Sequence, residues 1–244
     1  MDQLPRTLRV LWGLEPKPTR ATGPALSRDR IVRAAIELVD EQGMEALSMA
    51  RLAERLGCAT MSLYRHIASK DELQAVMFDA ALGEPPKDPA AGWRDGLEAW
   101  ARELLAVYHR HPWMPRMEIT GPPLAPGQLG WLDAGLALLR DTALPPIEQM
   151  SVMLLVSGYV RNEATMAFVG DQVRRESGAE GARETVEQVA RLLDPERFPA
   201  LCAVVETGAF AAAPFDFDHF AYGLQLILDS VQARANHQMT EQQK

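Results

Sequence analysis

The chain has 244 residues, 35 of them alanine, and 47% of its residues are hydrophobic, which excludes general disorder and allows a sizeable core. The formal charge is −8, from 25 Lys and Arg against 33 Asp and Glu, and Cys58 and Cys202 are the two cysteines. Two cysteines exclude a disulfide framework and predict a reducing, cytoplasmic setting. The apolar runs are too short or too interrupted for a signal peptide or a membrane span.

Apolar residues recur at intervals of three and four throughout, so we predict an all-α fold. Breaks rich in proline and glycine divide the chain at 83–92 and at 121–130. The expected helices cover 28–42, 48–55, 60–66 and 70–82 before the first break, and 93–110, 127–141, 147–176, 182–193, 197–207 and 216–234 after it. We predict a flexible extension at 1–25, a small head at 26–82, a larger body at 83–235 and a disordered tail at 236–244.

Helix ends in the head carry clear signals. Ser27, Ser48 and Ser69 each stand where a side chain can cap a helix, and Ser69 with Glu72 forms a capping box. Gly43 supplies the stop of the first helix. The buried stripe of that helix is predicted to contain Ile31, Ala34, Ala35, Leu38 and Val39. These signals fix the register of the segment between them.

The segment from Ser48 to Ala68 has the spacing of a helix-turn-helix. Leu52, Ala53 and Leu56 face inward from one helix, Gly57 permits the turn, and Leu63 and Ile67 face inward from the next. The outward residues of the second helix would be Thr60, Met61, Ser62, Tyr64, Arg65 and His66. An ordinary antiparallel helix pair has similar spacing, so this alternative stays open at this point.

The charge is unevenly distributed, in a way that fits a DNA-binding head. Residues 1–70 carry 11 Lys and Arg and 8 Asp and Glu, a balance of +3, whereas 71–244 carry 14 and 25, a balance of −11. A basic head on an acidic body indicates that one end meets a polyanion. Chance over an acidic surface gives the same figures, so charge alone does not decide.

The run RIVRAAIELVDEQGMEALSMARLAERLGCATMSLYRHIASKDEL resembles the N-terminal domain of the TetR family of bacterial transcriptional regulators. The LAERLG turn and the SLYRHIASKDEL stretch are its most specific parts, and the resemblance covers residues 26–82. HPW at 111–113, SGYVRNEA at 157–164 and the closing FDHFAYGLQLILDSV are similar to the tetracycline-repressor-like branch. Ala68 departs from the pattern, because many members carry a polar residue or glycine there.

The resemblance implies a DNA interface in the head. Ser48, Tyr64 and Lys70 would contact phosphates and set the register, while Thr60, Met61, Ser62 and Arg65 would face base edges. His66 would donate to a phosphate, or else pack into the core at the helix end. Arg6, Arg9, Lys17 and Arg20 of the extension would either enter the minor groove or belong to an untethered tail, and Trp12 indicates docking on the domain.

The body is predicted to pair with a second copy and to hold an effector. The stretch 147–169 is apolar on nearly every face up to Val160, and the last helix carries Phe217, Phe220, Ala221, Leu224, Ile227, Leu228 and Val231 on one face and Tyr222 and Leu226 on another. We expect these two helices to form a homodimer interface, although both would also serve as simple core. An unknown small hydrophobic ligand would lie between 93–110, 127–141 and 147–169. The expected lining residues are Trp100, Tyr108, Trp113, Met114, Leu155, Tyr159, Asn162 and Met166.

The resemblance implies a repressor that binds a pseudo-palindromic operator and is released by its effector. A regulator controlled by a protein partner has the same sequence features and stays an alternative. Catalysis is disfavoured, because the chain has no Gly-rich phosphate loop, nucleophile elbow or HExxH motif. His109 and His111 lack a second pair at helical spacing, so we expect no metal and no cofactor.

Overall fold

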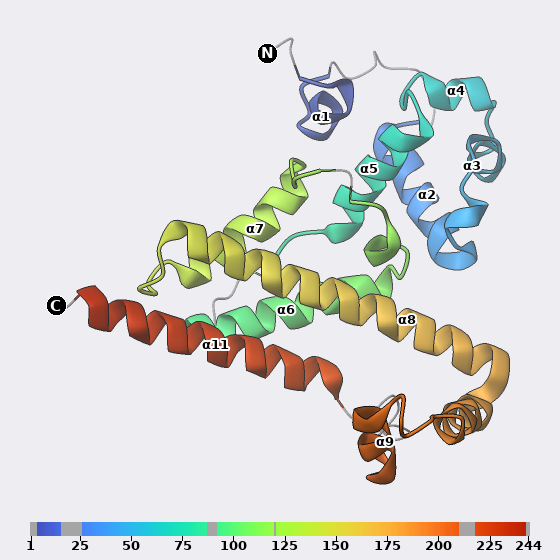
Figure 1. The fold of residues 1–244 in the computed structure, drawn as a ribbon. Helices are drawn as coiled ribbons and strands as arrows, with labels where there is room; N and C mark the ends of the chain where they lie inside the picture. Colours follow the sequence, from blue (N-terminus) through green and yellow to red (C-terminus); the bar gives the residue numbers. More distant parts are fainter. Residues whose placement is uncertain (1–3, 16–25, 87–91, 120, 210–217, 243–244) are drawn as a thin grey trace.

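The computed structural model describes residues 4–15, 26–86, 92–119, 121–209 and 218–242. Every regular element in these ranges is helical, which confirms the all-α prediction. Figure 1 shows a head formed by the helices α2 to α5 beside a longer body, with the shorter helix α1 lying next to both. Within the described ranges, no helix is long and apolar enough to cross a membrane.

The elements follow the chain in a simple order. They are α1 (Arg6–Leu11), α2 (Arg28–Gln42), η1 (Met44–Ala46), α3 (Met49–Leu56), α4 (Thr60–Tyr64), α5 (Lys70–Leu82), α6 (Trp93–Arg110), η2 (Met114–Arg116), α7 (Pro126–Leu139), α8 (Pro146–Arg191), α9 (Pro199–Glu206) and α11 (His219–Gln242). The expected helices are all present, with ends that differ by a few residues. The largest differences between expected and observed helices are α1, which was not expected, and α11, which ends at Gln242 rather than at 234.

The three predicted serine caps of the head are confirmed. Ser27 Oγ accepts the N–H of Arg30 at 3.2 Å, and Ser48 Oγ accepts the N–H of Arg51 at the same distance. Ser69 Oγ accepts the N–H of Glu72 at 3.0 Å. Each bond satisfies a backbone donor that has no partner within its own helix, so the three caps fix where α2, α3 and α5 begin.

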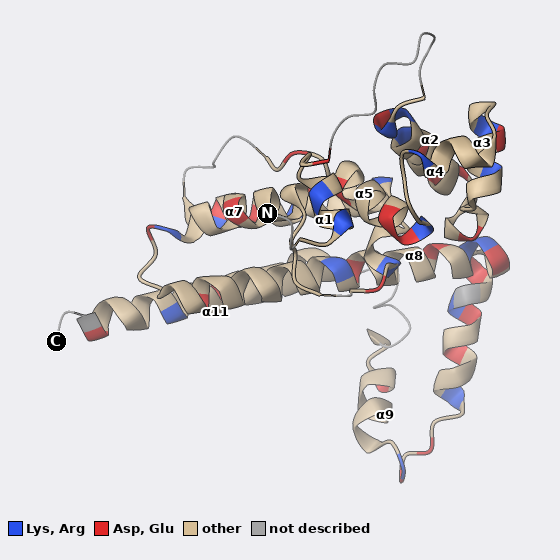
Figure 2. Ribbon diagram, turned by 90° about the horizontal axis from the view of Figure 1, so that it is seen from above, with Lys and Arg blue, Asp and Glu red and all other residues tan. Residues whose placement is uncertain are grey.

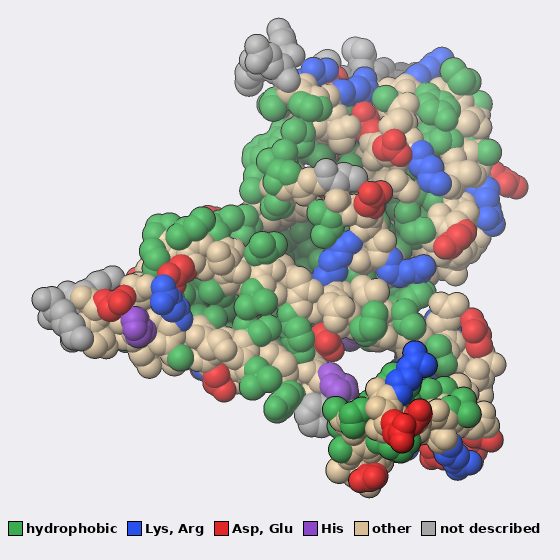
Figure 3. Space-filling model, viewed as in Figure 1, with side chains coloured by type: hydrophobic (Ala, Val, Ile, Leu, Met, Phe, Trp, Pro, Cys, Tyr) green, Lys and Arg blue, Asp and Glu red, His purple; other side chains and the backbone are tan. Residues whose placement is uncertain are grey.

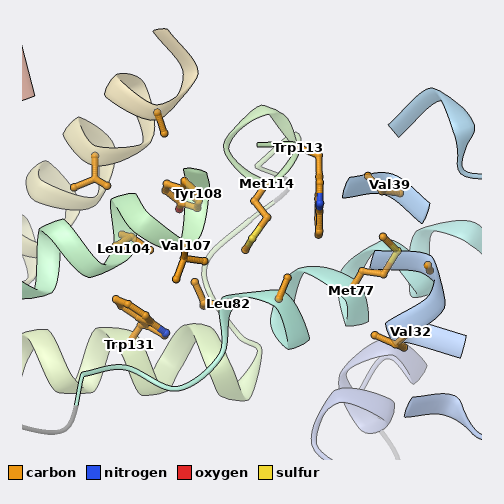
Figure 4. Close-up of a cluster of buried hydrophobic side chains, with 14 of the residues drawn as sticks. Val32, Val39, Met77, Leu82, Leu104, Val107, Tyr108, Trp113, Met114 and Trp131 are labelled. Carbon is orange, nitrogen blue, oxygen red and sulfur yellow. The ribbon is translucent and has the colours of Figure 1, made fainter. Parts of the chain in front are cut away.

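One hydrophobic cluster runs from the head into the body. Ile31 and Leu52 of the head are fully buried, and Trp113 and Met114 at η2 join the head helices to α6. In Figure 4, Trp113 and Met114 lie between Val39 on the head side and Tyr108 on the body side. The shared core therefore ties the orientation of the head to the body through close packing.

The body is built around α8. Its inward face carries Met153, Val156, Val160 and Ala164, all buried, and α11 runs antiparallel to it (Figure 1). Gly178, with φ 73° and ψ 161°, interrupts the helical geometry of α8. The sequence predicts two separate helices here, 147–176 and 182–193. The structure has one element, and its break at Gly178 lies between the two predicted helices.

Both predicted flexible ends are partly wrong. Within the extension 1–25, α1 packs on α5 and buries Val10. Within the tail 236–244, α11 continues to Gln242, because Ala235 is buried beside Leu144 and no glycine or proline interrupts the helix there. Lys17 and Arg20 lie outside the described residues, as does Phe217 of the predicted interface face.

Candidate nucleic-acid interface and effector cavity

The turn between α3 and α4 has helix-turn-helix geometry. Gly57 adopts the left-handed conformation, with φ 67° and ψ 37°, a backbone conformation that favours glycine. The N–H of Cys58 then donates to the carbonyl of Ala53 at 3.0 Å. Leu63 and Ile67 are fully buried, as predicted, so the opposite side of α4 is directed away from the core.

The α4 helix leaves its outward-facing residues accessible to different degrees. Met61 is 72% exposed, Tyr64 and Arg65 are exposed, and Thr60 and Ser62 are half-buried. The helix ends at Tyr64, two residues earlier than predicted, and the N–H groups of residues 66 and 67 both donate to the carbonyl of Leu63 in a tight turn. The short α4 therefore presents side chains on one accessible stretch rather than on a long helix face.

Candidate phosphate contacts flank α4 on both sides. Ser48 Oγ is occupied as an acceptor by its cap, but its hydroxyl proton stays free to donate to a phosphate. Lys70 is exposed at the first residue of α5. Figure 2 shows Lys and Arg positions in blue on the ribbons of α2 and α3, and Arg65 directly follows α4, whereas the run of α8 beside α11 is mostly uncharged.

His66 is half-buried, between the two environments that the sequence left open. Burial lowers the pKa of its imidazole, and the positive charges of Arg28 and Arg65 lower it further. The imidazole is therefore neutral near pH 7. A neutral imidazole keeps one N–H, so a phosphate contact does not require its protonation.

Two carboxylates of the head hold segments of the body. Asp40 on α2 accepts the indole N–H of Trp113 at 2.7 Å and lies 3.0 Å from Nδ1 of His111. Asp79 on α5 accepts the N–H groups of Gly127 and Gln128 at 2.8 and 3.3 Å. Sequence analysis missed both carboxylates, because their partners lie 48 to 73 residues away.

Asp79 caps the first turn of α7, which has no side-chain cap of its own. A carboxylate at a helix N-terminus is stabilised by the free N–H groups and the helix dipole. Burial nevertheless raises the pKa of Asp79, and the two backbone hydrogen bonds offset only part of that effect. A Cβ on Gly127 would lie 2.7 Å from Asp79 Oδ1, so glycine is what allows this close approach.

A cavity of about 920 Å³ lies where the head meets the body. Its walls are α1, η1, α5, the segments 113–119 and 121–125 and the start of α7, and Arg161 of α8 closes one side. The volume is typical of a site for a drug-sized molecule. Of the eight residues predicted to line an effector site, Trp113 is part of this wall.

The other predicted lining residues are placed elsewhere. Trp100, Tyr108 and Met114 are buried in the core, and Trp100 Nε1 donates to the carbonyl of Trp131 at 3.0 Å. Burial raises the pKa of the Tyr108 phenol, which fits a core position. Apart from Trp113, the aromatic residues proposed as cavity walls are therefore packing residues.

The predicted stripe on α8 does not face the interior. Leu155, Asn162 and Met166 are exposed, and the Tyr159 hydroxyl donates to the carbonyl of His219 at 2.6 Å while its ring stacks on Phe220. Because this part of α8 is apolar on nearly every face, its sequence does not reveal which stripe points inward. The inward stripe is the one that contains Met153 and Val156.

Metal chemistry has no support among the described residues. In those ranges, no group of three or more His, Cys, Asp and Glu side chains is arranged to hold an ion. His111 is instead engaged with Asp40, and His109 is exposed on the last turn of α6. Without a metal centre in these ranges, the features left to explain function are the accessible helix-turn-helix and the cavity at its junction with the body.

The sequence matches two family descriptions that divide it as the fold does. "Bacterial regulatory proteins, tetR family" matches residues 31–76, and "Tetracyclin repressor-like, C-terminal domain" matches residues 85–235. The chain belongs to the TetR family. Members of this family are transcriptional regulators and not enzymes, which agrees with the absence of catalytic motifs from the sequence.

Individual TetR-family proteins are similar over nearly the whole chain. The transcriptional repressor DrrR1 of Streptomyces coeruleorubidus is 38% identical, over 93% of this chain and 85% of its own. The class C tetracycline repressor of Escherichia coli is 29% identical, over 85% of this chain and 91% of its own. The crystal structure of apo ActR from Streptomyces coelicolor has a TM-score of 0.71 and 28% identity, covering 89% of this chain and 99% of ActR.

Proposed function

We propose that the protein is a repressor that binds a pseudo-palindromic operator as a homodimer in the cytoplasm and is released by a small, largely hydrophobic effector. The observation that carries the proposal is α4. Its buried residue Leu63 locks it onto the head, while Met61, Tyr64 and Arg65 stay exposed beyond the Gly57 turn. Such a helix is free to enter a major groove.

The contacts divide into two classes. Thr60, Met61, Ser62 and Arg65 would read base edges, with the guanidinium of Arg65 bidentate to guanine. Phosphate contacts are assigned to Ser48, His66 and Lys70, which lie on either side of the base-reading residues in the chain, and to Tyr64, which lies among them. These phosphate contacts fix the register and carry no sequence information.

A second copy is supported by the exposed apolar residues of α8 and α11. Figure 3 shows hydrophobic side chains gathered over the arm that α7, α8 and α11 form. The exposed large apolar residues of α8 and α11 in this arm include Ile147, Met150, Leu154, Leu155, Tyr222 and Leu226, and these six are called here the α8–α11 face. A face of this kind on a soluble chain is typical of an interface, and a twofold pairing would spread the two heads to two half-sites.

Release by a small molecule is supported by a relative and by the cavity. ActR has been solved in complex with actinorhodin, and that structure has a TM-score of 0.71 and 27% identity to this chain. The cavity of about 920 Å³ is large enough for a drug-sized molecule and touches both head and body.

The test is a selection of genomic DNA fragments on the full-length protein at low salt. We expect enrichment of fragments that share a pseudo-palindrome, whose half-sites lie roughly 34–36 Å or a multiple of that apart. Binding should weaken steeply as salt rises, because phosphate contacts release counterions. Failure to enrich any fragment with a folded, full-length protein would remove the proposal.

A further inference from the structure

Glu72 on α5 is the one charged residue that is buried among the residues that the structure describes, with only 3% of it exposed. A buried carboxylate is costly unless it is paired and hydrogen-bonded. Both oxygens of Glu72 are engaged: Oε1 accepts the N–H of Ala68 at 3.0 Å, and Oε2 accepts the Nε–H of Arg6 at 3.0 Å. Glu72 therefore joins the turn between α4 and α5 to the N-terminal helix α1.

Arg6 supplies the positive charge for this buried carboxylate. Within the described ranges it is the one ion-pair partner of Glu72, and its own side chain is 45% exposed. The exposure of the arginine keeps the strength of the pair modest. Loss of Arg6 would still leave the charge of Glu72 buried and unpaired. The carboxylate would then be better solvated if it turned toward water, away from the N–H of Ala68.

Arg6 is the first residue of a short helix that is held at both ends. Beyond the far end of α1, the indole N–H of Trp12 donates to the carbonyl of Leu124 at 3.0 Å, in the segment before α7. Between the two anchors, Val10 is buried and α1 packs on α5. The contact between Arg6 and Glu72 therefore belongs to a packed segment and not to a side chain that moves freely over the surface.

The turn that Glu72 holds directly follows the proposed DNA-reading residues. Ala68 comes three residues after Arg65 and two after His66. Arg28 of α2 holds the other side of the turn, where its Nε donates to the carbonyl of His66 at 3.4 Å. The α4 helix has five residues and no side-chain cap at its start, so it has little rigidity of its own. Contacts of the following turn therefore help to set the direction of Arg65.

We propose that Arg6 is a positioning residue for operator binding, which holds the turn between α4 and α5 through Glu72 and so sets the direction of Arg65 and His66. In this role Arg6 acts through Glu72 and does not contact DNA. The role differs from a minor-groove arm and from an untethered tail. The inference rests on the proposed function for its effect on DNA, whereas the hold on the turn exists without DNA and is tested separately.

Amide hydrogen exchange of the full-length protein, without DNA, tests the hold on the turn. We expect Arg6→Ala to raise the exchange rate of peptides that cover 65–69 about fivefold and to leave peptides of α2 unchanged. Arg6→Lys keeps the positive charge and should restore most of the protection. Unchanged exchange at the turn would overturn the proposal. A rise throughout the head would also overturn it, because it would show a general loss of stability.

A double-mutant cycle measures the effect on DNA. Arg6→Ala should weaken binding of the selected genomic fragment about fivefold and leave its salt slope unchanged, because no phosphate contact is lost. Glu72→Gln keeps an oxygen for the N–H of Ala68 and removes the charge that pairs with Arg6. In that background Arg6→Ala should have no further effect. An equal loss in both backgrounds would show that Arg6 acts through another group and would overturn the proposal.

Arg9→Ala distinguishes the positioning role from a minor-groove arm. Arg9 lies on the same helix, carries the same charge and pairs with Glu15 at 2.8 Å, within the segment 4–15 itself. An arm in the minor groove would use both arginines, so each substitution would weaken binding and lower the salt slope by about one. The positioning role predicts a loss confined to Arg6→Ala, with an unchanged slope. Lower slopes for both variants would overturn it.

Failure of this inference and failure of the proposed function give different results. If the wild type binds a selected fragment and Arg6→Ala protein binds it equally well, the proposed function stands and this inference fails. If the wild type binds no fragment, the proposed function fails, while the exchange rate of 65–69 still decides whether Arg6 holds the turn.

Discussion

At the scale of single residues, the proposed DNA interface gives different roles to two neighbouring cations, Arg65 and Lys70. Arg65 is exposed at the end of α4, and Lys70 is exposed at the start of α5. A guanidinium can form two hydrogen bonds with one guanine, whereas an ammonium on a phosphate acts as a point charge. The contact proposed for Arg65 would depend on the DNA sequence, and the one proposed for Lys70 would not.

We therefore expect different losses from Arg65→Ala and Lys70→Ala. Arg65→Ala should cost about 1–3 kcal/mol of operator binding and relax specificity at one base pair, while Lys70→Ala should weaken all sequences alike and lower the salt slope by about one. Titrations of the selected fragment and a scrambled fragment at several salt concentrations measure both effects. Arg140→Ala, an exposed charge at the end of α7, is the control. Equal loss of specificity in both head variants would contradict this division.

At the scale of elements, Asp79 joins α5 to α7. Its carboxylate caps the first turn of α7, yet its burial raises its pKa above the ordinary value of 3.8. Because the pKa of Asp79 is raised in the folded state, its protonated carboxyl contributes stability. This contribution is fully present at pH values below the pKa of the unfolded state. That contribution is lost as the pH rises through the folded pKa. At pH 7 the ionised group still caps α7, but at a desolvation cost.

Substitutions of Asp79 by asparagine and by alanine should therefore have different effects on the free energy of unfolding. Asp79→Asn keeps an oxygen that accepts the N–H of Gly127 and removes the buried charge, so its free energy of unfolding at pH 7 should equal or exceed that of the wild type. Asp79→Ala removes the cap and should cost about 1–2 kcal/mol. Denaturant unfolding between pH 3 and pH 7 measures this, and the Asn variant should also lose the slope that Asp79 contributes. A larger loss for Asn than for Ala would refute the interpretation.

The head could be predicted from sequence because its signals are local. Ser27, Ser48 and Ser69 cap helices three residues away, and Gly57 determines its own turn. In contrast, α1 depends on partners 66 and 112 residues away, so the segment alone looks like a flexible tail. The cavity walls follow from the same distant contacts.

The inward face of α8 was unpredictable for another reason. Leu155 and Val156 are adjacent and both apolar, yet Leu155 is exposed and Val156 is fully buried. A helix with apolar residues around its circumference fits several rotations about its axis, and packing against α6 and α11 selects one of them. The prediction of surplus apolar surface on this helix depended on composition alone, and it agrees with the exposed α8–α11 face.

At the scale of the whole molecule, DNA binding through α4 and pairing through the α8–α11 face belong to the same proposed complex. In the proposed complex, one head reads one half-site, and a short α4 offers few base contacts, so we expect a single copy to bind weakly. Two heads held by a rigid body gain from effective concentration, which raises the affinity for two half-sites about 10²-fold or more over one. The proposed interface between copies should therefore matter as much for operator binding as the residues proposed to touch DNA.

Leu154→Glu tests this arrangement. Leu154 is 77% exposed in the single chain, so a charge there should leave the fold intact and should disrupt pairing of the α8–α11 face. Leu192→Glu is the matched control, because Leu192 is 81% exposed but lies beyond the end of α8. Light scattering at micromolar concentration should give a dimer mass for the wild type and the control and a monomer mass for Leu154→Glu. Operator affinity should fall about 10²-fold with the dimer, while half-site affinity stays unchanged. A monomeric wild type, or full operator affinity in monomeric Leu154→Glu protein, would show that the α8–α11 face has another role.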